Sequence, residues 1–82
     1  MNKQRRKALD EVHSKLMTIV EELEDIEAEE EDAYYNLPEG IQNSEKGEKM
    51  QEYVEIISST RYQIDEMLGY IWDIIAPLYE KR

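Results

Sequence analysis

The sequence predicts an all-α fold: a long antiparallel helical hairpin, coiled-coil-like, that dimerises into a four-helix bundle. Two segments carry apolar residues at alternating spacings of three and four, which places those residues along one side of an α-helix. Pro38 and Gly40 interrupt this pattern between them, and two long helices joined by a short connection pack as antiparallel neighbours. We therefore expect one domain over residues 1–82, divided into helix 3–35, turn 36–43, helix 44–76 and a short tail 77–82.

The first predicted helix contains no glycine or proline and is rich in Glu, Lys, Leu and Ala, which favour helices. At 1.5 Å per residue it would be about 50 Å long, which is typical of a coiled-coil arm rather than of a helix in a compact fold. Its expected apolar seam follows the three-four spacing and consists of Leu9, Val12, Leu16, Ile19, Leu23, Ile26, Glu30 and Ala33.

The predicted connection ends one helix and starts the next. Pro38 has no amide hydrogen and disfavours the helical conformation of the preceding residue, while Gly40 tolerates left-handed dihedral angles. Asn43 or Ser44 can cap the second helix by accepting a hydrogen bond from a free amide at its start. Gly47, in the first turn of that helix, lowers helix propensity by up to about 1 kcal/mol relative to Ala.

The second predicted helix carries two apolar lines. The first is the expected seam toward the first helix: Met50, Tyr53, Ile57, Thr60, Ile64, Met67, Ile71, Ile74 and Leu78. The second line lies beside it and consists of Val54, Arg61, Leu68, Trp72, Ile75 and Tyr79. Because one neighbouring helix covers only one line, we expect the second line to be the interface of a homodimer or, alternatively, of a foreign protein.

The position of the connection also predicts the register of the two helices. With the fold point near residue 40, Leu9 should lie beside Ile71 and Leu23 beside Ile57. Arg61 is a polar break in the second line, and we expect it to fix the register by pairing with an acid of the first helix such as Glu22.

The charge is strongly acidic and unevenly distributed. Twenty acidic residues against ten basic ones leave a net charge of −10, which argues against direct binding to nucleic acid or to an anionic membrane. From Glu21 to Ile56 there are fourteen acids and two bases. This acidic surface is either a solvated face, or the counterpart of the basic terminal end in an antiparallel dimer, or a mimic of nucleic-acid phosphates.

No residue pattern predicts catalysis, a cofactor or a metal site. The chain has no cysteine, which fits a cytoplasmic protein, and a single histidine, His13, without a second ligand or an activated nucleophile beside it. No apolar run approaches the roughly 18–20 residues of a membrane span. Five acids loosely imitate the magnesium-site spacing of all-α nucleotide pyrophosphohydrolases, but the seam directs most of them outward. They are Glu21, Glu22, Asp25, Glu52 and Glu55.

The run YYNLPEGIQNSEKGEKM, residues 34–50, contains tyrosines, an Asn-Leu-Pro-Glu turn and a Ser-Glu-basic-Gly-acidic entry into the second helix. In these features it resembles the junction of a group of small acidic two-helix proteins from phages and prophages of Gram-positive bacteria. The segment from Tyr70 to Tyr79 does not match the plainer second helix of that group. The resemblance implies a phage setting, the cytoplasm of a host cell and no active site, and it favours a role in host takeover.

We therefore expect a non-enzymatic interaction module that occupies the surface of another protein. In its sharper form, the acidic helix face mimics nucleic acid and enters a basic groove of a host protein; in the alternative, the protein is a structural coiled coil whose main partner is a second copy of itself. The residues expected to bind a partner on the acidic face are Glu21, Glu24, Asp25, Glu27, Glu31 and Asp32.

Overall fold

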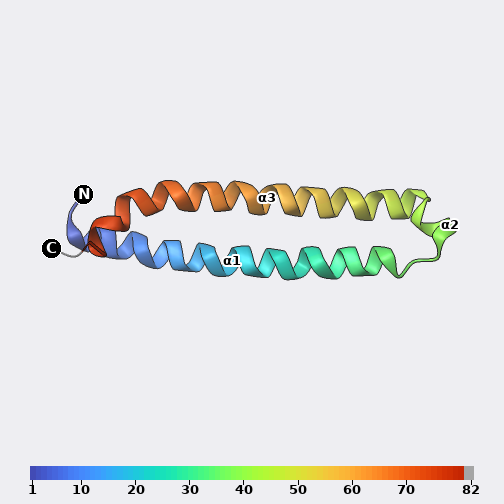
Figure 1. Cartoon of the computed structure of the whole chain (residues 1–82), viewed down its shortest axis with the longest axis horizontal. Coiled ribbons are helices and arrows are strands. Elements are labelled where there is room, and N and C mark those ends of the chain that lie inside the picture. Colours follow the sequence, from blue (N-terminus) through green and yellow to red (C-terminus); the bar gives the residue numbers. More distant parts are fainter. Residues whose placement is uncertain (81–82) are drawn as a thin grey trace.

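The computed structural model describes residues 1–80, and two long helices dominate it (Figure 1). The elements in chain order are α1 (Lys3–Tyr35), α2 (Glu39–Gln42), α3 (Glu45–Ile75) and the 3₁₀ turn η1 (Ala76–Leu78). Helices α1 and α3 run side by side in opposite directions and form a rod with extents of 61 × 18 × 15 Å. The prediction of an all-α fold with a long helix pair is confirmed, and residues 1–80 contain no strand.

Helix α1 begins and ends at defined capping contacts. The side chain of Asn2 accepts a hydrogen bond from the Arg5 amide at 2.8 Å, which satisfies one of the free donors at the helix start. At the other end, the side-chain amide of Gln42 lies 3.1–3.3 Å from the carbonyl oxygens of Tyr34, Tyr35 and Leu37. The connection therefore folds back onto the end of α1 and satisfies carbonyls that the helix leaves free.

The connection also packs closely against the first turn of α3, at Gly47. This glycine is buried, and a Cβ atom built on it would lie 2.6 Å from the carbonyl carbon of Gln42. Ser44 occupies the N-cap position of α3, but its hydroxyl donates to the carbonyl of Ile41 and makes no capping bond to the helix. Gly47 is thus needed because the loop backbone comes too close for a side chain.

Each long helix turns two columns of residues toward the other. In α1 these columns consist of residues that are covered or half-covered: Arg6, Leu9, His13, Leu16, Val20, Leu23, Glu27, Glu30 and Tyr34. In α3 they are Gly47, Met50, Val54, Ile57, Arg61, Ile64, Leu68, Ile71 and Ile75. The most deeply buried apolar side chains are Val20, Leu68 and Ile75, with exposed fractions of 7%, 8% and 0%.

The predicted seam is therefore correct for one column of each helix and wrong for the other. Leu9, Leu16 and Leu23 do face α3, as Ile57, Ile64 and Ile71 face α1. In each helix, the other expected column faces outward. The residues that directly follow it in the chain face the opposite helix in its place. The misplaced residues are Val12, Ile19, Ile26 and Ala33 in α1 and Tyr53, Thr60, Met67 and Ile74 in α3.

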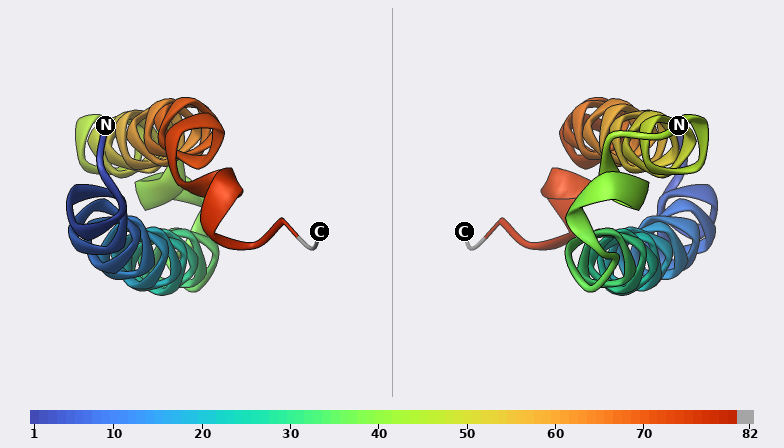
Figure 2. Two further views of the ribbon diagram at one scale, coloured as in Figure 1. Left: turned by 90° about the vertical axis from the view of Figure 1, so that its left-hand side faces the viewer. Right: turned by 90° about the vertical axis from the view of Figure 1, so that its right-hand side faces the viewer.

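Contacts between the two helices agree only in part with the expected register. Near the terminal end, the Nε of Arg6 donates a hydrogen bond to the carbonyl oxygen of Ile74, a pair whose numbers sum to the expected 80. The fold point near residue 40 would set Arg61 level with Ile19, but Arg61 contacts Glu24 and Glu27, five and eight residues further along α1. The Tyr79 hydroxyl likewise bonds Asp10, beyond the part of α1 that the expected register sets level with it. Helix α3 extends past the end of α1, and α2 packs against α3 (Figures 1 and 2).

Across residues 1–80, no helix combines the length and the apolarity that crossing a membrane requires.

Candidate functional site

The acidic half of α1 presents most of its predicted partner-binding carboxylates to solvent. Glu21, Asp25, Glu31 and Asp32 are all exposed. Within the part of the chain that the structure describes, the ion pairs involve other carboxylates, so these four carry uncompensated negative charge. The remaining two predicted residues, Glu24 and Glu27, are in contact with Arg61 of α3.

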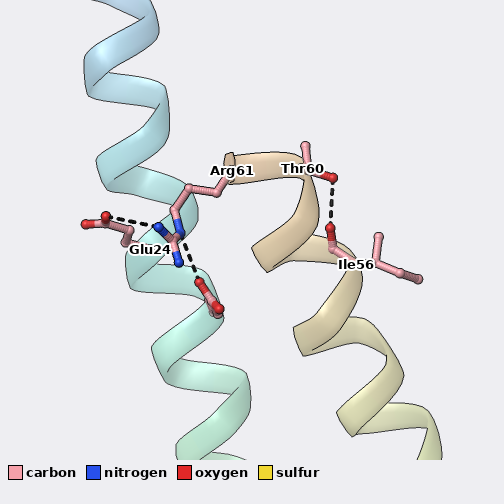
Figure 3. A network of polar contacts seen from close by, with 5 residues as sticks. Glu24, Ile56, Thr60 and Arg61 are labelled. Atoms are coloured by element: carbon pink, nitrogen blue, oxygen red, sulfur yellow. Dashed lines mark hydrogen bonds and ion pairs between the residues drawn. The ribbon is translucent and has the colours of Figure 1, made fainter. Parts of the chain in front are cut away.

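Arg61 draws these two carboxylates into a contact between the helices. It extends from α3 to α1, as Figure 3 shows for its approach to Glu24. Its Nε donates a hydrogen bond to Glu27 at 3.1 Å, and its Nη1 lies 3.6 Å from a carboxylate oxygen of Glu24. The side chains of Arg61 and Glu27 are only 18% and 15% exposed, whereas Glu24 is 53% exposed. The Arg61–Glu27 pair is therefore part of the hairpin core.

The electrostatics of this contact keep Arg61 charged. Partial burial by itself would lower the pKa of the guanidinium, but the hydrogen bond and charge of Glu27, with the charge of Glu24, outweigh it and raise the pKa. The expected partner Glu22 is exposed, and Arg61 pairs with Glu24 and Glu27 instead. A polar pair inside an apolar seam penalises any sliding of one helix past the other, since sliding would leave a charge unpaired.

The second apolar line of α3 is largely covered by α1. Leu68 and Ile75 are buried, and Val54 and Arg61 are half-covered. The expectation that the hairpin's own first helix leaves this line uncovered is therefore wrong for these four residues. Trp72 and Tyr79 stay 44% and 55% exposed beside the seam.

Trp72 and Tyr79 form an aromatic cluster that joins the terminal ends of the two helices. Their rings stack with centroids 5.4 Å apart, and the His13 ring lies 6.0 Å from that of Trp72. The Tyr79 hydroxyl donates a hydrogen bond of 2.5 Å to Asp10. This hydrogen bond, with some burial and the charge of Asp10, raises the pKa of Tyr79 above its usual value of about 10.

An exposed apolar surface runs along both helices, and all of its members except Ile56 were expected inside the seam. We call it the apolar flank. Its members share exposed fractions of 40–55%, and they are Val12, Ile19, Ile26, Tyr53, Ile56, Met67 and Ile74. The signal was present in the sequence as a regular three-four spacing, but that spacing does not say which neighbour a column faces.

The acidic side chains of residues 1–80 are spread along the rod and do not gather into a metal site. No three Asp, Glu or His side chains converge there in a way that could hold a metal ion. The acids with magnesium-site-like spacing, such as Asp25 and Glu52, point to solvent. The exposed features of the described residues that bear on binding are the acidic surface of α1, the aromatic cluster and the apolar flank.

Comparison of the chain with protein-family models, with curated proteins and with solved structures found no match.

Proposed function

We propose that the protein is a non-enzymatic interaction module whose acidic surface mimics nucleic acid and occupies a basic groove of a partner protein. The observation that carries this proposal is the density of carboxylates on one helix, of which all but Glu27 and Glu30 are exposed. Nine of the twelve residues from Glu21 to Asp32 are acidic. At 1.5 Å per residue this is about one carboxylate per 2 Å of helix axis, close to the one charge per about 1.7 Å of duplex DNA.

The Arg61 contact changes this density only slightly. Its single positive charge offsets part of the charge of Glu24 and Glu27, which leaves about one net negative charge per 2.3 Å of axis. The contact also ties the acidic half of α1 to α3, so the exposed carboxylates are displayed on a fixed scaffold. A preorganised array loses less conformational entropy on binding than a disordered acidic tail does.

The direction of α1 supports an external partner. The acidic segment occupies the C-terminal half of the helix, where the helix dipole favours cations rather than anions. No basic residue lies in the last turn of α1. A basic groove would compensate both the dipole and the carboxylates. The resemblance of residues 34–50 to small phage proteins favours a host protein as the owner of that groove.

The test compares two variants of equal net charge. In the acid variant, Glu21→Lys, Asp25→Lys and Asp32→Lys remove three outward carboxylates of the acidic surface. In the matched control, three outward acids elsewhere change in the same way: Glu11→Lys, Asp73→Lys and Glu80→Lys. Circular dichroism should show both to be helical.

The immobilised full chain is used to capture proteins from a bacterial lysate at low and high salt, followed by elution with duplex DNA. We expect the wild type and the control to retain nucleic-acid-binding proteins that high salt and DNA both release, because release of condensed ions makes such contacts salt-dependent. The acid variant should capture at most about a tenth of the amount of these proteins that the wild type captures. Equal capture by all three proteins, or captured proteins that DNA does not displace, would refute mimicry.

A second candidate function, that of a structural protein whose main partner is a second copy of itself, is favoured by the apolar flank. In that case the acid variant should behave as the wild type does, and only changes on the flank should alter its state.

A further inference from the structure

We propose that the apolar flank is the contact surface between two copies of this chain, packed face to face and in opposite directions as a four-helix bundle. The inference uses a different surface from the proposed function and does not depend on it.

The first step is that the flank columns of both helices lie on one face of the rod. Flank residues directly precede a covered residue: Ile19 precedes Val20, and Met67 precedes Leu68. Each helix of an antiparallel pair has two covered columns. On both helices, the residues that directly precede the column of Val20 or of Leu68 lie on the same side of the pair, and the residues that directly follow the other covered column lie on the opposite side. The opposite side is identified by contacts: Asp10 bonds Tyr79 there, and Glu31 and Gln51 line one shallow depression.

The second step concerns the number of apolar columns. A helix of a two-stranded coiled coil needs two apolar columns per heptad, whereas a helix in a bundle carries a third. Both α1 and α3 carry the third column, and in both it faces the same way. The hairpin is therefore one layer of a two-layer structure, and a second such layer completes a four-helix bundle.

The third step is that the flank is self-complementary. Its columns span residues 12–33 of α1 and 53–74 of α3, and the Arg61 contact places the midpoints of these spans at about the same level. A two-fold axis there, perpendicular to the rod, brings Ile19 against Ile26 of the second copy and Tyr53 against Ile74. Thr60, near the centre, then faces Met67 of the second copy.

The fourth step sets the direction by charge. Parallel copies would place two segments with a net charge of −12 each side by side, since 21–56 holds fourteen acids and two bases. Opposite directions set each acidic half beside a terminal half that holds eight bases and six acids. Lys15, at the edge of the flank, then comes to the level of Glu29 of the second copy.

The area of the face is sufficient for a stable dimer. Even at the smaller lateral extent of 15 Å, a face 61 Å long offers about 900 Å². A standard protein–protein interface buries about 800 Å² per partner. The exposed apolar side chains lie along the centre of the face, where burial contributes most to affinity.

Sedimentation equilibrium of the full chain with a matched pair of variants tests the dimer. Met67 lies on the flank and Met17 on the opposite face, and both side chains are 50% exposed. We expect Met67→Gln to raise the dimer dissociation constant at least tenfold and Met17→Gln to change it less than twofold, with unchanged helicity for both. A wild type that stays monomeric at high concentration, or equal effects of the two variants, would overturn the proposal.

A spin label tests the direction. The chain has no cysteine, so Lys7→Cys accepts one label per copy. Opposite directions place the two labels about 45 Å apart along the rod, whereas parallel copies would bring them within a bundle width of each other. A short label–label distance would overturn the antiparallel arrangement. A monomer that instead binds a foreign protein through Met67 would overturn the dimer itself.

Discussion

The terminal half and the loop half of the hairpin are held together in different ways. The terminal half contains the buried side chains of Val20, Leu68 and Ile75 and the stacked rings of Trp72 and Tyr79. The loop half contains no apolar side chain of comparable burial; polar and backbone contacts made by Arg61, Gln42 and Gly47 hold it. The comparison shows that a helical rod can keep one register although its apolar packing is concentrated at one end.

The largest effect is expected at the best-packed position of the terminal half. Ile75→Ala should lower the free energy of unfolding by about 2–5 kcal/mol, because the side chain is fully buried and its removal leaves a cavity. Urea unfolding followed by circular dichroism at fixed protein concentration measures this loss. Ile57→Ala, at a half-covered position in the loop half, should lose clearly less. Equal losses would show that apolar packing is uniform along the rod.

The next effect concerns the polar contact at the boundary of the two halves. Arg61→Met should lower the midpoint of thermal unfolding, less than Ile75→Ala does, because it leaves Glu27 half-buried without a cation. The double variant Arg61→Met with Glu27→Leu should regain or exceed the wild-type midpoint, since an apolar pair can replace a buried ion pair. A double variant as unstable as the single one would mean that the contact contributes packing rather than charge pairing.

A smaller effect is expected where the connection meets α3. Gly47→Ala should lower stability by about 1–2 kcal/mol: the collision with the Gln42 backbone outweighs the gain in helix propensity. Gly69→Ala is the matched control, since a Cβ there meets nothing within 4 Å. It should raise stability by up to about 1 kcal/mol. Stabilisation by both changes would show that the Gln42 backbone does not pack closely against Gly47.

The smallest effect is a pH dependence at the terminal end. The pKa of Tyr79 is raised in the folded state, so its hydrogen bond to Asp10 stabilises the fold below the unfolded-state pKa of about 10 and is lost as the pH rises through the folded value. Urea midpoints measured from pH 8 to 11 should therefore fall more for the wild type than for Tyr79→Phe. Parallel curves for the two proteins would contradict a stabilising role for this hydroxyl.

The main elements of the fold could be predicted from the sequence because their signals are local. The long uninterrupted periodicity of 3–35 and the break at Pro38 define a helix and its end through each residue's own backbone preferences. Helix α3 begins at Glu45 and ends at Ile75, close to the expected range 44–76. The ion pairs of Arg61 were not predictable in this way, because they depend on which columns of the two helices face each other, which no local preference describes.

The orientation of the helices was mispredicted because each carries three apolar or partly apolar columns. In α1 the column with Ile19 and Ile26 is more apolar than the column that contains His13 and Glu27. Taken alone, α1 would be expected to bury the former. Only when Glu27 meets Arg61 across the seam does burying the more polar column become favourable. The acidic surface was easier to anticipate, because exposed carboxylates follow from composition.

The elongated shape has a practical consequence for measuring molecular size. The radius of gyration is 18.3 Å, whereas a globular chain of this length would have about 12 Å. A value of 18.3 Å belongs to a globule of about 260 residues. A single hairpin would consequently leave a gel-filtration column earlier than a globular protein of the same mass. Elution volumes calibrated with spherical standards therefore overstate the mass of one hairpin, and only methods independent of hydrodynamic radius count its copies correctly.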